Sequence, residues 1–211
     1  MRILKRNIDK AEIAEMELSA FGGRIIVAQS AGEAEKAVAY LNNQPYVGID
    51  TETRPSFRRG QSFGVSLLQV STVDNCFLFR LSRTGFTEGM KQFFQSPSPI
   101  KIGLSLRDDF VRLHAAGDFE PCGYLELQQY VAQMGFEAQS LQKIFAILFG
   151  RRISKSQRLS NWEADVLTDA QKLYAATDAW ACIRIYEELQ RLEKEGYELS
   201  SPSSQNLGCI I

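Results

Sequence analysis

The chain has 211 residues, of which 45% are hydrophobic, and this is enough apolar material for one sizeable core. Its formal net charge of -1 provides no general electrostatic attraction for nucleic acid, so any such binding needs a local basic surface. A single histidine, His114, excludes zinc sites and acid–base mechanisms that need two histidines.

Targeting and redox features are sparse. No run of about 18 apolar residues occurs, so the sequence predicts no membrane span. The N-terminus becomes charged at once and lacks the apolar core of a signal peptide, which favours a cytoplasmic location. The four cysteines are widely spaced and form no CxxC pair, which argues against a disulfide framework or a zinc site.

The apolar pattern predicts an α/β domain in which a mixed sheet is flanked by helices. Short β-prone segments predict strands at residues 24–28, 46–49, 65–71, 76–81 and 100–104. The second to fourth of these are close neighbours and are expected to form antiparallel hairpins. Helical spacing predicts helices at residues 9–18, 30–41, 87–94, 109–115, 125–134, 141–148 and 168–195. Capping-box patterns mark two helix starts, at Ser30 with Glu33 and at Thr168 with Gln171.

Three parts are predicted along the chain: an N-terminal helical extension at 1–23, a main domain at 24–195 and a flexible C-terminal tail at 196–211. Gly22 and Gly23 end the first part, because glycine disfavours continuation of a helix. The last part is rich in serine, glycine, proline and asparagine, which is typical of loose termini.

Asp50 and Glu52 follow an apolar strand directly. Residues two apart on a strand point to the same face, so these two carboxylates repel each other. The repulsion is tolerated if the pair is exposed, if one group is protonated, or if a cation lies between them. Taken alone, D-x-E often arises by chance, and a solvated strand end is the simpler interpretation.

Two further acidic residues lie in predicted helices. Tyr174 and Asp178 are four residues apart and share one helix face, beside small alanines that allow close packing. Asp109 lies near a helix start, where aspartate is common because it favours the helix dipole. Each feature has an ordinary structural explanation, and it is their joint occurrence that indicates a shared site.

In these motifs the chain resembles the DEDDy 3′–5′ exonucleases of the ribonuclease H-like superfamily, in the branch of the Werner-syndrome exonuclease domain and ribonuclease D. The first motif matches at residues 47–53 and the second at 103–113. The third matches at residues 167–179 and is preceded by Ser160-Asn161-Trp162. The resemblance spans roughly residues 24–191. It implies a ribonuclease H-like mixed β-sheet flanked by α-helices, with 24–195 as the exonuclease domain.

The resemblance also implies roles for five residues. Asp50, Glu52, Asp109 and Asp178 would be the metal carboxylates, and Tyr174 would orient the attacking water. Asp108 stands beside Asp109, and the spacing to the end of the second motif favours Asp109. Glu126 stands where many relatives carry an aspartate.

The implied activity is removal of nucleotides from the free 3′ end of nucleic acid, with DNA favoured over RNA as the substrate. No membrane is expected among the binding partners. Hard carboxylate oxygens suit two Mg²⁺ or Mn²⁺ ions, and the absence of cysteine and histidine clusters argues against zinc. Basic and aromatic residues near the motifs would bind the substrate by backbone contacts and base stacking. These candidates are Arg54, Lys155, Arg158 and Trp162, with Phe57, Arg58, Arg59, Phe63, Arg151 and Arg152 as further members.

Two other functions stay open from sequence. One is a nucleic-acid-binding module of the same fold that lacks catalysis, against which the complete set of motif residues argues. The other is a structural or signalling domain whose acidic cluster is accidental or binds Ca²⁺.

Overall fold

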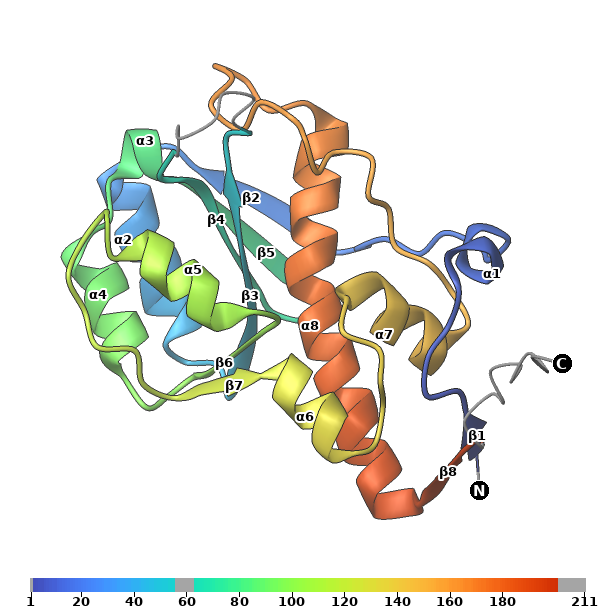
Figure 1. Cartoon of the computed structure of the whole chain (residues 1–211). Coiled ribbons are helices and arrows are strands. Elements are labelled where there is room, and N and C mark those ends of the chain that lie inside the picture. Colours follow the sequence, from blue (N-terminus) through green and yellow to red (C-terminus); the bar gives the residue numbers. More distant parts are fainter. Residues whose placement is uncertain (1, 56–62, 201–211) are drawn as a thin grey trace, which may run out of the picture.

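The structure, a computed structural model, describes residues 2–55 and 63–200 and contains a six-stranded mixed sheet between two helical layers (Figure 1). The strand order is β2-β5-β4-β3-β6-β7. The strands are β2 Arg24–Ala28, β3 Tyr46–Thr53, β4 Val65–Ser71, β5 Asn75–Arg80, β6 Ile100–Gly103 and β7 Tyr124–Glu126. The predicted α/β class is confirmed.

The middle of the sheet is formed by β3, β4 and β5, which pair antiparallel and so confirm the predicted hairpins. β6 pairs with β3 in parallel, which makes β3 an interior strand. All residues of β4 are buried, because helices cover both faces of the sheet. The two acidic residues of the first motif lie in the last part of β3, where Asp50 is opposite Gln69 and Glu52 is opposite Leu67.

Helices on the two faces enclose separate parts of the core. One face is covered by α2 Ala31–Leu41, α4 Glu88–Gln95 and α5 Leu106–Leu113 (Figure 1). The other is covered by α6 Leu127–Gln133, α7 Leu141–Phe149 and α8 Asp169–Glu195. A short helix, α3 Leu81–Thr84, follows β5.

The long helix α8 starts at a capping box, as predicted. Thr168 accepts from the backbone of Gln171, and the Gln171 side chain accepts from the backbone of Thr168. The helix packs closely on β3: a Cβ added at Gly48 would lie 1.9 Å from the carbonyl oxygen of Ala179. This close approach places the third motif beside the first.

Gly48→Ala is therefore expected to destabilise the protein by about 1–3 kcal/mol, because an added methyl must push the helix from the strand. Urea unfolding measures this loss. Gly32→Ala is the matched control, since a Cβ there meets nothing within 4 Å and alanine favours a helix. Equal stability of the two variants would contradict the close packing.

The two ends of the described chain pair with each other. β1 Arg2–Leu4 and β8 Tyr197–Leu199 form a two-stranded parallel sheet next to the C-terminal end of α8 (Figure 1). The prediction of a loose tail from residue 196 is thus wrong for residues 197–199, because Leu4 and Leu199 join the core around α8. The rest of the predicted tail, 201–211, lies outside the described residues.

Two other elements differ from the sequence prediction. The helix expected at residues 9–18 is α1 Lys10–Ala14, after which the chain extends. The helix expected at 125–134 is preceded by β7, whose three residues complete the sheet edge beside β6. Strands this short carry too few residues to show a period of two.

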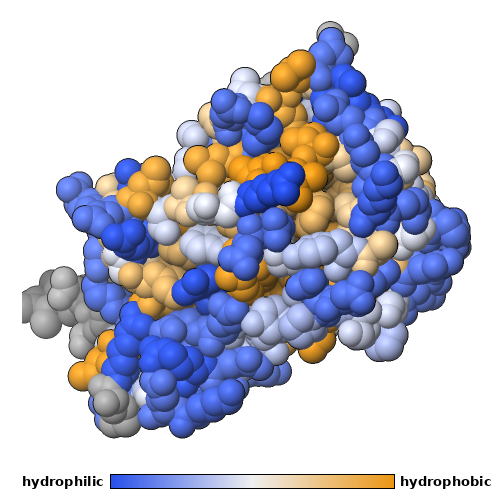
Figure 2. All heavy atoms as spheres, turned by 180° about the vertical axis from the view of Figure 1, so that it is seen from behind, coloured by the Kyte–Doolittle hydropathy of each residue, from blue (hydrophilic) through white to orange (hydrophobic). Residues whose placement is uncertain are grey.

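None of the helices in the part of the chain that the structure describes has the length and apolar character needed to cross a membrane. On the face shown in Figure 2, hydrophilic residues occupy most of the rim and apolar residues gather toward the upper middle. Scattered exposed apolar side chains are normal on protein surfaces.

Candidate metal centre and active site

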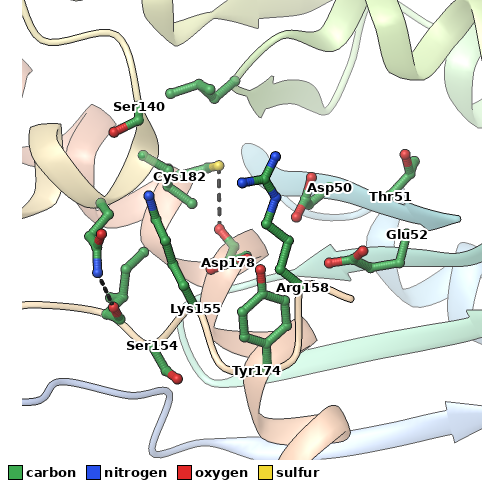
Figure 3. Close-up of a pocket in the computed structure, with 14 residues that line it drawn as sticks. Asp50, Thr51, Glu52, Ser140, Ser154, Lys155, Arg158, Tyr174, Asp178 and Cys182 are labelled. Carbon is green, nitrogen blue, oxygen red and sulfur yellow. Dashed lines mark hydrogen bonds between the residues drawn. The ribbon is translucent and has the colours of Figure 1, made fainter. Parts of the chain in front are cut away.

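Three acidic side chains from distant parts of the sequence meet at the end of β3 (Figure 3). Asp50 and Glu52 come from β3, and Asp178 comes from α8. One carboxylate oxygen of each lies within 4.8 Å of the others. The i, i+2 spacing on the strand and the close approach of α8 at Gly48 bring these groups together.

The three carboxylates repel one another when they are ionised. Burial, followed by the neighbouring Asp178 and Asp109 charges, raises the pKa of Asp50 well above its ordinary value. Burial and the same neighbours raise the pKa of Glu52 to about 8, and burial raises the pKa of Asp178 to about 7. A cation between these oxygens relieves both the repulsion and the lost hydration. The donor set, made of hard oxygens, fits Mg²⁺ or Mn²⁺.

Asp109 lies next to this cluster but is not one of its three members. It is buried on α5, and its Oδ1 accepts a hydrogen bond from the Thr51 hydroxyl. Its charge nevertheless raises the pKa of Asp50 and Glu52, so it faces the same region. Asp108 is exposed, which agrees with the choice of Asp109 from the motif spacing.

Glu126 forms hydrogen bonds with the backbone at the start of α5. Its carboxylate accepts hydrogen bonds from the backbone N–H groups of Ser105 and Leu106, at 2.9 and 2.7 Å. A carboxylate at this position also favours the helix dipole. Glu126 therefore anchors the helix that carries Asp109.

Tyr174 lies one helical turn before Asp178 and is largely buried beside it (Figure 3). A hydrogen bond with Tyr174 lowers the pKa of Asp178, partly opposing the effect of burial. Burial and the surrounding carboxylates raise the pKa of the Tyr174 hydroxyl far above its ordinary value. The hydroxyl therefore keeps its proton at neutral pH, and it can position a water molecule but cannot deprotonate one.

The carboxylates line a pocket of about 350 Å³ that also contains two basic side chains, Lys155 and Arg158 (Figure 3). The Arg158 charge lowers the pKa of Glu52, and the Asp178 charge raises that of Lys155, so each cation faces the acidic cluster. Burial and nearby cations lower the pKa of Lys155 overall. A pocket with clustered acids opposite two cations can hold a metal-bound phosphate.

The remaining substrate-binding predictions are placed differently. Trp162 is 1% exposed and packs against Tyr174, with ring centroids 6.0 Å apart, so the expectation that it stacks on a base is wrong. Arg54 pairs with Glu163 at 3.2 Å and lies over the Phe63 ring, outside the residues that line the pocket. Phe57, Arg58 and Arg59 lie outside the described residues.

Sequence reasoning missed several residues of the pocket wall. Ser140, Leu141 and Gln142, at the start of α7, line it together with Cys182. The thiol of Cys182 donates to the carbonyl oxygen of Asp178 at 3.4 Å. Cys182 could have been found from its spacing, because residues four apart on a helix share one face.

Comparisons with known proteins identify the relatives of this chain. Residues 25–193 match the family model described as 3'-5' exonuclease. The chain is 30% identical over 182 residues to the mouse protein named bifunctional 3'-5' exonuclease/ATP-dependent helicase WRN, covering 82% of this chain and 13% of that one. It is 30% identical over 192 residues to a protein of Arabidopsis thaliana named 3'-5' exonuclease, covering 82% and 65%. The chain thus spans less than two thirds of either relative.

Solved structures show the same fold. The EXO domain of Aedes aegypti Nibbler superposes with a TM-score of 0.77 at 19% identity, over 85% of this chain and 95% of that one. Escherichia coli RNase D gives a TM-score of 0.71 at 20% identity, over 82% and 46%.

Fold and site together define a ribonuclease H-like α/β domain with a carboxylate cluster suited to divalent cations. Because the family model covers most of its length, the chain belongs to the 3′–5′ exonuclease family.

Proposed function

We propose that this protein hydrolyses phosphodiester bonds from the 3′ end of nucleic acid. The observation that carries the proposal is the convergence of Asp50, Glu52 and Asp178 in one pocket with Tyr174 and two basic side chains. Bound there, two divalent cations would activate the attacking water and stabilise the leaving oxygen. The carboxylates would hold these cations, and Tyr174 would orient the water by its hydroxyl.

Lys155 and Arg158 are proposed to contact the phosphate of the substrate. Both line the carboxylate pocket, where an arriving phosphate would lie between them and the cations. Charge-assisted hydrogen bonds of this kind position the phosphate without reading the base. Arg54 keeps at most a peripheral role, because its guanidinium already pairs with Glu163.

Digestion of matched 3′-labelled and 5′-labelled oligomers with Mg²⁺ or Mn²⁺ tests the function. The expected result is a ladder of shortening 5′-labelled products and early release of the 3′ label. DNA and RNA oligomers of one sequence report the sugar preference, for which the sequence favours DNA. Binding of the oligomers without cleavage would instead indicate the catalytically silent module.

Asp109 is proposed as the fourth carboxylate of the site. Asp109→Asn is expected to slow digestion at least tenfold, because the negative charge of Asp109 faces the same region as Asp50 and Glu52 and would help to hold the cations there. Asp108→Asn, at the exposed neighbouring position, is the control and should leave the rate unchanged. The opposite result would assign the second motif to Asp108.

Tyr174→Phe is expected to lower kcat about 10- to 100-fold, since a hydrogen bond to a charged group contributes about 1.5–3 kcal/mol. Stabilisation by Mn²⁺ should persist, because the three carboxylates stay in place. Unchanged kcat in steady-state digestion would remove Tyr174 from the mechanism.

A further inference from the structure

Residues 16–21 are here called the N-terminal brace. The brace contacts the loop that carries Lys155 and Arg158, and it also contacts the helix that carries Asp178. We infer that the brace positions these two basic side chains over the carboxylates. This inference rests on the proposed function. The brace lies before residue 25, where the match to the family model begins, so it is a feature of this chain outside the matched domain.

The basic loop, residues 150–168, joins α7 to α8 without a helix or strand of its own in the described structure. Ile153 and Trp162 are buried and anchor it to the core. Lys155 and Arg158 lie between these anchors, Lys155 just before and Arg158 within the turn at residues 156–159. A connection this long keeps one conformation only when other parts of the protein hold it.

The brace pairs with the base of this loop through the backbone. Leu18 and Arg152 form a parallel β-bridge. The Ser19 N–H donates to the carbonyl oxygen of Arg152 at 2.7 Å, and the Arg152 N–H donates to that of Glu17 at 3.0 Å. These two bonds fix the direction in which the chain enters the basic loop.

Side chains reinforce this pairing. The Arg152 Nε donates to the carbonyl oxygen of Met16 at 3.0 Å. The Arg151 guanidinium pairs with Glu17 at 2.7 Å, at an exposed position. Met16, Glu17 and Ser19 of the brace therefore hold the two residues that precede Ile153.

At its other end the brace contacts α8 beside the metal ligand. The Phe21 N–H donates to the Thr177 hydroxyl at 3.1 Å, and that hydroxyl donates to the carbonyl oxygen of Leu173 at 2.6 Å. Thr177 directly precedes Asp178. Leu18 and Ser19 also line a cavity of about 140 Å³ that borders Tyr174. The brace thus ties the basic loop to the helix turn that carries Tyr174 and Asp178.

Loss of the brace contacts has a defined consequence for the proposed reaction. The carboxylates are held by β3 and α8, which pack directly on each other at Gly48 and Ala179, so metal binding persists when the pairing of Ser19 with Arg152 is lost. The basic loop would sample more conformations, and Lys155 and Arg158 would face the phosphate for less of the time. Substrate binding therefore weakens while turnover of bound substrate changes little.

Ser19→Pro tests this, because proline removes the N–H that donates to Arg152. Ser19→Ala is the matched control, since it keeps this N–H. Ser19→Pro is expected to raise KM for a 5′-labelled oligomer about five- to tenfold, the equivalent of about one hydrogen bond, with kcat within about twofold. Ser19→Ala should match the wild type. An unchanged KM in folded Ser19→Pro overturns the inference.

A double-mutant cycle shows whether the brace acts through the basic side chains. In a Lys155→Ala, Arg158→Ala background, Ser19→Pro should raise KM no further. A second full increase would overturn the inference, because the brace would then act by another route.

If Ser19→Pro does not fold, an exchange of exposed charges replaces it. Glu17→Arg is expected to raise KM at low salt, and adding Arg151→Glu should restore it. An unchanged KM in Glu17→Arg would overturn the inference in that case.

Failure of the wild type to cleave any oligomer would refute the proposed function itself. Normal wild-type cleavage with unaffected brace variants would refute only the role inferred for the brace.

Discussion

Asp178→Asn is expected to reduce the rate of 3′-end digestion about a thousandfold. Bound divalent cations supply several kcal/mol of transition-state stabilisation, and each 1.4 kcal/mol is about tenfold in rate. Asp178 is one of three carboxylates in reach of one cation, and it also holds Tyr174. The amide of the asparagine that replaces it is neutral and cannot supply the negative charge that the cation requires.

The fold should survive this substitution. Asparagine has the shape of aspartate and removes a buried negative charge from a group of repelling carboxylates. Asp169→Asn, at the exposed start of the same helix, is the control and should digest like the wild type. Wild-type rates in Asp178→Asn that are abolished by a chelator, as in the wild type, would contradict the assignment of the site.

The free energy of unfolding is expected to depend strongly on pH and on bound metal, because both act on the same carboxylates. In the unfolded chain Glu52 and Asp178 have ordinary pKa values of 4.5 and 3.8, whereas folding raises them to about 8 and about 7, first by burial. The folded metal-free protein therefore binds more protons than the unfolded chain in this range. These groups thus stabilise the folded state most at low pH, and this contribution is lost as pH rises toward about 8.

Mn²⁺ should reverse this trend, because it competes with protons for the same oxygens. Thermal unfolding is expected to show little effect of Mn²⁺ at pH 5 and a large one at pH 8. At a hundredfold excess over Kd the stabilisation should approach about 2.7 kcal/mol. In Asp50→Asn the metal effect should vanish, and the metal-free protein should be more stable at pH 8 than the wild type. Equal stabilisation by Mn²⁺ in both proteins would place the metal elsewhere.

The sequence was sufficient for the elements that carry strong local signals. The β-prone, apolar character of residues 24–28 and 65–71 predicted two strands with the bounds that the structure has. The Thr168 capping box located the start of α8, which positions Asp178. The motif spacing placed the D-x-E pair at the end of β3, where the structure has it.

Other features depend on contacts that local patterns do not contain. The pairing of β1 with β8 joins opposite ends of the chain through three residues each, so neither strand is visible alone. Trp162 looked like a stacking platform, yet its ring is buried behind Tyr174, since burial depends on the path of the whole loop. The hydrogen bond from Thr51 that distinguishes Asp109 from the other carboxylates is likewise a tertiary contact.

Anomalous diffraction from crystals soaked in Mn²⁺ would locate any cations bound by the carboxylate cluster. Manganese is expected within about 2.2 Å of carboxylate oxygens of Asp50, Glu52 and Asp178, with a second ion about 4 Å away. Crystals of Asp178→Asn should lose most of this signal. Manganese bound elsewhere at saturating concentration, with none at these oxygens in the wild type, would show that the carboxylate cluster is not a metal site.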